Sequence, residues 1–271
     1  MGSYVSKQKQ IQFHILSDKN EADYHLSEAE KKDFYLEECH DSKSNQLARS
    51  TLSYSTNEMT PDDDLFFQVV MENAKAEIPL RLHQELSDVY IVQLMPSADG
   101  GMPHTRPDRL ICYPNIRATF SVETVIHELW HVHQREYPKW WRQVFHSLGW
   151  EPWPDKTLPP SLEQYRRYNP DTLDAPLWCY QKTWIPVPIF RDIITPKVDE
   201  VSIWFYHVSL NYHVKHPPRE LTELYPSLPL HAFEHPREMA AYLLSNPRRH
   251  VDCPGWKSWI ETVGAVSLPI E

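Results

Sequence analysis

Glycine is scarce in this chain, with 6 glycines against 24 prolines in 271 residues. Glycine-rich phosphate-binding loops and long flexible linkers both depend on glycine, so the composition argues against either. Proline stiffens the segments that it occupies, because its ring fixes the backbone angle φ. We therefore expect irregular but rigid connections and no phosphate-loop nucleotide site.

Cysteine is scarcer still, and the 4 cysteines are far apart in the sequence. None of them forms a C-x-x-C pair, so their spacing indicates neither a zinc ribbon nor a disulfide framework. Free thiols in a reducing compartment are the simplest interpretation.

Long apolar runs are absent as well. No stretch approaches the roughly 20 apolar residues that are needed to cross a bilayer. Residues 1–12 lack the apolar region of a signal peptide. These absences predict a cytoplasmic protein with no membrane partner.

Positive charge is in deficit, and the formal net charge is -10 with the 15 histidines counted as neutral. An acidic balance of this size argues against nucleic acid as a partner. The contents of 41% hydrophobic and 24% charged residues are typical of a soluble globular protein. The length allows one large domain or two small ones, and the oligomeric state is left open.

The most informative stretch that is present is His127-Glu128-Leu129-Trp130-His131, an H-E-x-x-H motif. A helix places residues i and i+4 on one face, so the two imidazoles can share a metal ion, with Glu128 beside it. Ser121 is a suitable N-cap for such a helix, which should end near Glu136, before Pro138. The spacing therefore predicts a helix that binds zinc.

A hydrolytic zinc site needs a third protein ligand and one open position. The metzincin pattern would require Gly at position 134 and His at position 137, where this chain has Gln134 and Tyr137. Glu238 resembles the third ligand of gluzincin-type metallopeptidases, a glutamate on a later helix, since it lies in the first turn of a helix that Pro236 begins. Three residues further, Ala241 is small enough for this helix to pack closely against the motif helix.

Several other residues are alternatives for the third ligand. His133 lies two residues after His131 and so points to another side of the helix. Glu234 and His235 precede the later helix and are better interpreted as loop or capping residues. The remaining alternatives for this role are His146, His207, His213 and His231.

Start signals predict further helices. Thr60, Pro61 and Asp63 have the residue types of an N-cap, N1 and N3, and the helix that follows should run from Asp62 to about Leu86. Ser27-Glu28-Ala29-Glu30 has the pattern of a capping box before a helix that reaches about Cys39. Residues 40–58 are polar and are expected to form a loop or a mobile segment.

Strand patterns flank a glycine-containing hairpin. Residues 89–94 and 110–113 are rich in β-branched and aromatic residues and are predicted to be strands. Between them, residues 100–108 are expected to form a hairpin. Residues 138–229 are rich in proline and aromatic residues and predict short helices, short strands and ordered loops.

Residues 89–137 together with residues 234–244 resemble the gluzincin type of zincin-like metallopeptidase. The resemblance rests on the H-E-x-x-H motif and on the later E-x-x-A segment that begins at Glu238. It implies an α+β fold: a zincin-like core with a small mixed sheet, an edge strand, the motif helix and the glutamate helix. Residues 61–271 would be the catalytic domain, with a lobe inserted at about 138–229, and residues 1–60 an N-terminal segment.

A second resemblance concerns two short segments. Met102-Pro103-His104-Thr105 and Asn169-Pro170-Asp171-Thr172 are similar to segments of a group of uncharacterised zinc-peptidase-like proteins. This likeness implies no substrate.

The gluzincin resemblance implies Zn²⁺ as the cofactor and assigns residue roles. His127, His131 and Glu238 would be the metal ligands, and Glu128 the general base that takes a proton from water activated by zinc. The separation of His131 from Glu238 is longer than in compact gluzincins, and an inserted lobe would explain it.

The resemblance also implies groups that act on the substrate. Peptidases of this type stabilise the oxyanion with a histidine or a tyrosine. Tyr206 and His207 are the favoured candidates, and Tyr242, one turn after the glutamate ligand, is another. The edge strand beside the cleft pairs with an extended substrate by β-augmentation. The residues His104, Thr105 and Arg106 are therefore expected to contact substrate, with a plain tight hairpin as the alternative.

The sequence thus predicts a soluble zinc-dependent hydrolase, with a metallopeptidase as the leading hypothesis. One alternative is a hydrolase or biosynthetic enzyme that acts on a small-molecule amide. Another is a zincin-fold binding module without catalytic activity, although such a module has no need for Glu128. The expected partner is a peptide or a small amide.

Overall fold

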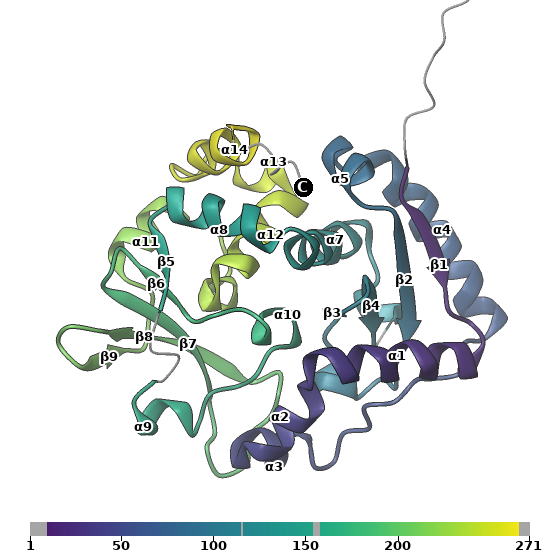
Figure 1. Ribbon diagram of the computed structural model, residues 1–271, viewed down its shortest axis with the longest axis horizontal. Helices are drawn as coiled ribbons and strands as arrows, with labels where there is room; N and C mark the ends of the chain where they lie inside the picture. The colour runs from purple at the N-terminus through teal and green to yellow at the C-terminus, as the bar shows by residue number, and fades with distance from the viewer. Residues whose placement is uncertain (1–9, 115, 154–157, 266–271) are drawn as a thin grey trace, which may run out of the picture.

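The structure is a computed structural model that describes residues 10–114, 116–153 and 158–265 (Figure 1). The described part of the chain is a mixed α and β structure with two small sheets, as the α+β prediction requires. In Figure 1 the two sheets lie on the right and on the left, with helices α7 (Val122–Glu136) and α12 (Pro236–Ser245) between them. These two helices pack directly against each other.

The first sheet has four strands in the order β1-β2-β4-β3. Strands β1 and β4 run parallel to β2, and β3 runs antiparallel to β4, which leaves β3 at the edge. The predicted strands at 89–94 and 110–113 are β2 and β4, and the predicted hairpin contains β3. The bounds are β1 Gln12–Ile15, β2 Asp88–Gln93, β3 His104–Arg106 and β4 Leu110–Tyr113.

Alternation along the strands gives this sheet two buried faces. Val89, Ile91 and Ile111 belong to the cluster that includes helices α4 and α7. Val92 and Leu110 point the other way, into a cluster with α1. Full burial of an aliphatic side chain of this size contributes about 1.5–3 kcal/mol, so packing on both faces holds the sheet in place.

Helix α4 (Pro61–Glu77) begins as predicted, because Thr60 and Asp63 form a reciprocal capping box. A cap of this kind contributes roughly 1 kcal/mol. The expected continuation of this helix to Leu86 is wrong. The chain is extended at Ile78, as is usual before a proline, and a separate helix, α5 (Leu80–Glu85), follows.

The predicted helix start at Ser27 is also wrong. Helix α1 (Lys19–Asp33) begins at Asp18, whose carboxylate accepts hydrogen bonds from the backbone of the first turn, so Ser27 lies inside the helix. The helix ends at Phe34, where φ is 52°. Two short helices follow, and the second lies in the segment that was expected to be a loop. They are α2 (Tyr35–Asp41) and α3 (Lys43–Arg49).

The second sheet is an antiparallel meander in the order β5-β6-β7-β8-β9. Its strands are β5 Trp150–Pro152, β6 Trp178–Tyr180, β7 Trp184–Phe190, β8 Val201–His207 and β9 Tyr212–Val214. The remaining helical elements are α6 Ile116–Thr119, α8 Pro138–Ser147, α9 Pro160–Glu163, α10 Pro170–Leu173, α11 Arg219–Leu224, α13 Pro247–His250, α14 Trp256–Ala265 and the 3-10 segments η1 Ala98–Gly101 and η2 Leu230–Glu234.

Aromatic side chains join the second sheet to the helices above it in Figure 1. The ring of Phe145, in α8, contacts the rings of Trp141, Trp178 and Trp259 at centroid distances of 5.2–6.2 Å. These rings belong to the same buried cluster as α7 and the first sheet. The aromatic residues of the middle segment thus form core packing that continues to the motif helix.

None of the described helices is long and apolar enough to cross a membrane.

Candidate metal centre

Helix α7 presents both histidines of the motif on one side. Its start is set by Ser121, whose hydroxyl accepts a hydrogen bond from the backbone N–H of Thr124 at 3.2 Å. The opposite side of the helix is anchored by buried Val125 and Leu129. The predicted bounds of this helix are confirmed.

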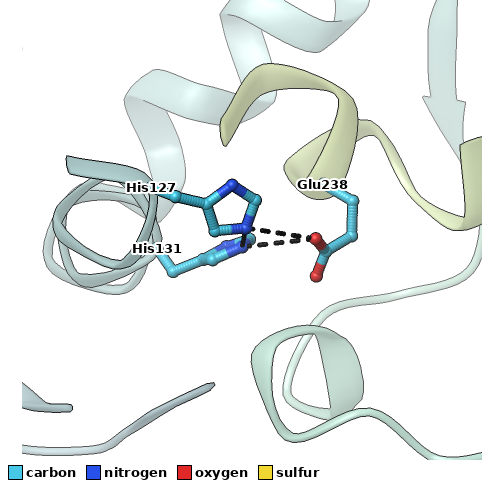
Figure 2. Close-up of side chains that lie close together, drawn as sticks. All are labelled: His127, His131 and Glu238. Carbon is cyan, nitrogen blue, oxygen red and sulfur yellow. Dashed lines mark hydrogen bonds and ion pairs between the residues drawn. The ribbon is translucent and has the colours of Figure 1, made fainter. Parts of the chain in front are cut away.

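Glu238 faces the two histidines from α12 (Figure 2). The Nε2 atoms of His127 and His131 are 3.1 Å apart. Each lies 3.5 Å from Oε2 of Glu238. Three potential ligand atoms from two helices therefore converge on one point, with His131 and Glu238 buried and His127 partly buried. Close packing of the helices is possible because Ala241 is small and fully buried.

These distances fit a divalent cation bound by three ligands. Two ligands of a tetrahedral zinc ion, with bonds of about 2.0–2.2 Å, are roughly 3.3–3.6 Å apart. The three measured separations lie at or close to this range. A set of two imidazoles and one carboxylate suits zinc and also accepts other divalent transition metals.

Gln134 holds the ring of His131 in the tautomer that a metal ligand needs. Its side-chain N–H donates to the backbone carbonyl of Arg237 at 2.9 Å, and a carbonyl can only accept. The amide oxygen of Gln134 must then face Nδ1 of His131, which lies 2.9 Å away and donates its proton. When the ring is neutral, as a metal ligand must be, the lone pair is thereby left on Nε2, the atom that points at Glu238.

Asn169 orients the carboxylate of Glu238. Its side-chain amide donates to Oε1 of Glu238 at 3.0 Å and to Oε1 of Glu234 at 2.5 Å. Its own oxygen accepts the backbone N–H of Asp171 at 3.0 Å, which makes Asn169 the N-cap of α10. With Oε1 engaged in this way, Oε2 of Glu238 is the oxygen turned toward the histidines.

The charges of the cluster reinforce one another. Burial opposes the charged form of His131, but the neighbouring Glu238 carboxylate outweighs it and raises the pKa of His131 to about 10. Burial likewise opposes the charge on Glu238, yet His131 and His127 hold its pKa well below the usual value. Glu238 is therefore an ionised carboxylate, the form in which it ligates a metal.

Glu128 lies in the wall of a cavity of about 600 Å³ that also contains His127 and Glu238. Its side chain is 3% exposed, and within the described part of the chain its Oε2 has no hydrogen-bond partner. Burial, and next the charge of Asp171, raise the pKa of the Glu128 carboxyl well above its usual value. A buried carboxylate with a free oxygen and a raised pKa has the properties of a proton-transfer group.

Tyr242 is the tyrosine that the structure brings to this cavity. Its ring contacts the ring of His127 edge-on, with centroids 4.6 Å apart. Its hydroxyl lies 2.7 Å from Nε2 of His231, another cavity residue. Burial, and next the charge of Glu238, raise the pKa of Tyr242 far above its usual value, so its hydroxyl keeps its proton.

Tyr206 and His207 are not brought to the site. Both lie on β8, at the end that pairs with β9, and neither lines the cavity. The hydroxyl of Tyr206 donates to Asn211 at 3.0 Å. The ring of His207 packs on Trp184 and Tyr212.

The alternative ligands have other contacts. His133 is fully buried and is held between Glu85 and the indole N–H of Trp141, away from Glu238. His235 caps α12 by accepting the backbone N–H of Arg237, the capping role expected from its position. Glu234 pairs with Arg167, and both residues line the cavity.

The predicted substrate residues of the edge strand have different positions. His104 lines the cavity and contacts Tyr54 through Nε2 at 2.6 Å. Thr105 is completely buried, and its N–H and hydroxyl both donate to Asp171. Arg106 is also completely buried, in ion pairs with Glu30 and Asp33.

No local sequence pattern indicates the roles of Gln134 and Asn169 in orienting the metal ligands. The sequence of Asn169 and Pro170 has an N-cap and N1 pattern that marks a short helix, but nothing local indicates that the side chain reaches Glu238. Comparisons of the chain with family models, with curated proteins and with solved structures found no match.

Proposed function

We propose that this chain is a metal-dependent hydrolase of amide bonds, with zinc as the metal and a zincin-like arrangement of the motif helix and the glutamate helix. The observation that carries the proposal is the convergence of His127, His131 and Glu238 on one point in the wall of a cavity. Glu128, one residue along the same helix, adds a carboxylate with a free oxygen to that wall. Ligands and base come from the residues that the gluzincin resemblance names.

A zinc ion held by these three side chains would polarise a substrate carbonyl and make water more acidic. Glu128 would take one proton from the water as its oxygen adds to the carbonyl carbon. It would then give that proton to the nitrogen as the C–N bond breaks, so one water is consumed and an acid and an amine are formed. Tyr242 would donate its hydroxyl proton in a hydrogen bond to the carbonyl oxygen as negative charge develops there.

The alternative of a non-catalytic binding module is supported less well. A structural zinc site closes its fourth position with a protein ligand, whereas a catalytic site leaves that position to water or substrate. The only cluster of three potential ligands found among the described residues is the set His127, His131 and Glu238. The same side chains border a cavity that can admit a substrate.

Metal content measured by mass spectrometry is the first test. Wild-type protein should carry one zinc per chain, and His131→Ala and Glu238→Ala should lose it. Glu128→Gln should retain zinc and abolish hydrolysis of the amides that wild type cleaves. Wild-type protein without metal after zinc is supplied, or full activity in Glu128→Gln, would remove the proposal.

A further inference from the structure

The outer side of the edge strand β3 is already occupied by the protein's own side chains. The middle residue of β3 lies opposite Ile111 of β4, and its backbone N–H and C=O point away from β4, because both bond to side chains outside the sheet. This residue is Thr105. Its N–H donates to Oδ1 of Asp171 at 2.7 Å, and its carbonyl accepts from Arg135 at 3.2 Å.

The residues on either side of β3 have no backbone N–H to donate. Residues 103 and 107 directly precede and follow β3. Both are prolines, which have no N–H. From Pro103 to Pro107, the edge strand therefore offers no free outward N–H to another strand.

The short helix α10 fills the space between the edge strand and the metal centre. At the start of α10, Asn169 donates a hydrogen bond to the metal-ligand candidate Glu238. Two residues later, Asp171 accepts a hydrogen bond from Thr105. Asp171 lines the same cavity as Glu128, and its charge acts on that carboxylate. Figure 1 shows α10 beside β3, in the direction of the second sheet.

Arg135, which bonds to the outward carbonyl of Thr105, also belongs to a set of ion pairs. Arg135, at the end of α7, also pairs with Asp174 at 3.1 Å. Asp174 in turn accepts from Arg237 at 2.5 Å, next to the ligand Glu238. Opening the edge strand would break the hydrogen bonds of Thr105 to Asp171 and Arg135. Arg135 belongs to the same set of ion pairs as Arg237, the residue before Glu238.

We propose that the substrate is a compact amide that enters the cavity without adding a strand to β3. This inference rests on the proposed function of the same site and specifies its substrate class. An extended polypeptide bound by β-augmentation needs free outward N–H and C=O groups on the edge strand, and here they are taken. The cavity of about 600 Å³ lies within the range of about 300–1,000 Å³ that small-molecule sites occupy.

The substrate is then recognised by side chains that line the cavity, and not by backbone hydrogen bonds along β3. Three of the side chains that line the cavity are His104 at the edge strand, Tyr242 on α12 and Arg191 in the β7–β8 connection. A substrate of about the size of a dipeptide or tripeptide is of the class that a cavity of this volume encloses. A longer chain would gain no additional backbone contacts along β3.

Amide hydrogen exchange at Thr105 tests directly whether its outward N–H is occupied by Asp171. The measurement requires neither metal nor activity. In wild-type protein the Thr105 amide should exchange at least about 100-fold more slowly than in an unstructured peptide. Asp171→Ala should accelerate its exchange, and the control Asp199→Ala, at an exposed carboxylate elsewhere on the cavity wall, should not. Exchange of the wild-type Thr105 amide at the unstructured rate would overturn the proposal.

Hydroxamate ligands test the substrate class on zinc-loaded Glu128→Gln protein. Calorimetry would compare glycine hydroxamate with hydroxamates of a dipeptide and of a pentapeptide. The pentapeptide should bind less than tenfold more tightly than the dipeptide. A gain of tenfold or more would show strand addition and overturn this inference alone. Absence of zinc from the wild-type protein would instead remove the proposed function.

Discussion

The side-chain amide of Asn169 bridges two carboxylates, those of Glu238 and Glu234, with N–O distances of 3.0 and 2.5 Å. Both carboxylates are buried, and Glu234 is also paired with Arg167. Because an amide N–H can only donate, Asn169 favours the ionised form of both groups. The orientation of the third metal ligand therefore depends on a residue in α10, far from it in the sequence.

Replacement of this amide should weaken the metal centre. In Asn169→Leu, a side chain of similar size lacks the donor, so Oε1 of Glu238 loses its fixed partner. Zinc affinity is expected to fall about 10- to 100-fold, the usual effect of removing a group that orients a ligand. Competition with a chromophoric chelator measures it. Asn73→Leu, on the exposed face of α4, is the matched control and should bind zinc as wild type does. Unchanged affinity in Asn169→Leu would show that Glu238 needs no such support.

The tautomer of His131 provides a second prediction. Gln134→Leu removes the acceptor for the Nδ1 proton, so zinc affinity should again fall by about 10- to 100-fold. Gln134→Glu keeps an acceptor at this position and should lose less affinity than the leucine variant. The ¹⁵N chemical shifts of the His131 ring would report the tautomer independently of binding. Equal zinc affinities in the two variants would show that metal binding does not depend on this hydrogen bond.

Tyr242 is expected to contribute to catalysis without contributing to metal binding. Tyr242→Phe keeps the ring that packs on His127 and removes only the hydroxyl. Loss of one hydrogen bond to a developing oxyanion typically lowers kcat by about 10²- to 10³-fold. Steady-state kinetics on any cleaved amide, together with metal analysis, checks both parts. Tyr206→Phe, away from the cavity, should leave kcat unchanged. An unchanged kcat in Tyr242→Phe together with a lowered kcat in Tyr206→Phe would assign oxyanion stabilisation to Tyr206 instead.

Local sequence signals were sufficient where a short window contains all the determinants. The motif helix has its cap at Ser121 and its apolar face within a few residues, and its predicted bounds agree with the structure. Glu238 could be selected because Pro236 marks the helix start and Ala241 permits close packing. The start of α1 was missed because a capping-box pattern at Ser27 also occurs inside a helix that Asp18 has already begun.

Tertiary relationships could not be derived in this way. Whether Thr105 is open to a substrate depends on Asp171, and their contact depends on how α10 packs against the edge strand. Each of the two segments indicates a local structure, a strand and a helix N-terminus. Neither indicates the other as its partner, because side-chain pairing over this sequence distance has no periodicity.

The buried ion pair of Asp99, a residue of the cavity wall, predicts how stability depends on pH. Asp99 and Arg49 are 2.9 Å apart, with 1% and 11% of their side chains exposed. Burial alone would raise the pKa of the Asp99 carboxyl, but Arg49, with smaller effects from His104 and Tyr35, holds it below the usual value. Asp99→Asn removes the charge while tolerating the left-handed backbone at this position, where φ is 46°. At pH 7 its free energy of unfolding should be about 3 kcal/mol lower than that of wild type, because Arg49 is left unpaired.

The sign of the pH dependence follows from the lowered pKa. The carboxylate stabilises the folded state at every pH above the unfolded pKa of about 3.9, and this stabilisation is lost as the pH falls through the lower folded pKa. The difference between wild type and Asp99→Asn should therefore be constant from pH 7 to about pH 4 and shrink below that. Urea unfolding at a series of pH values measures it, with Glu223→Gln, in an exposed pair with Arg219, as the control. A difference that persists unchanged at pH 2 would mean that the cost arises from packing and not from the charge of Asp99.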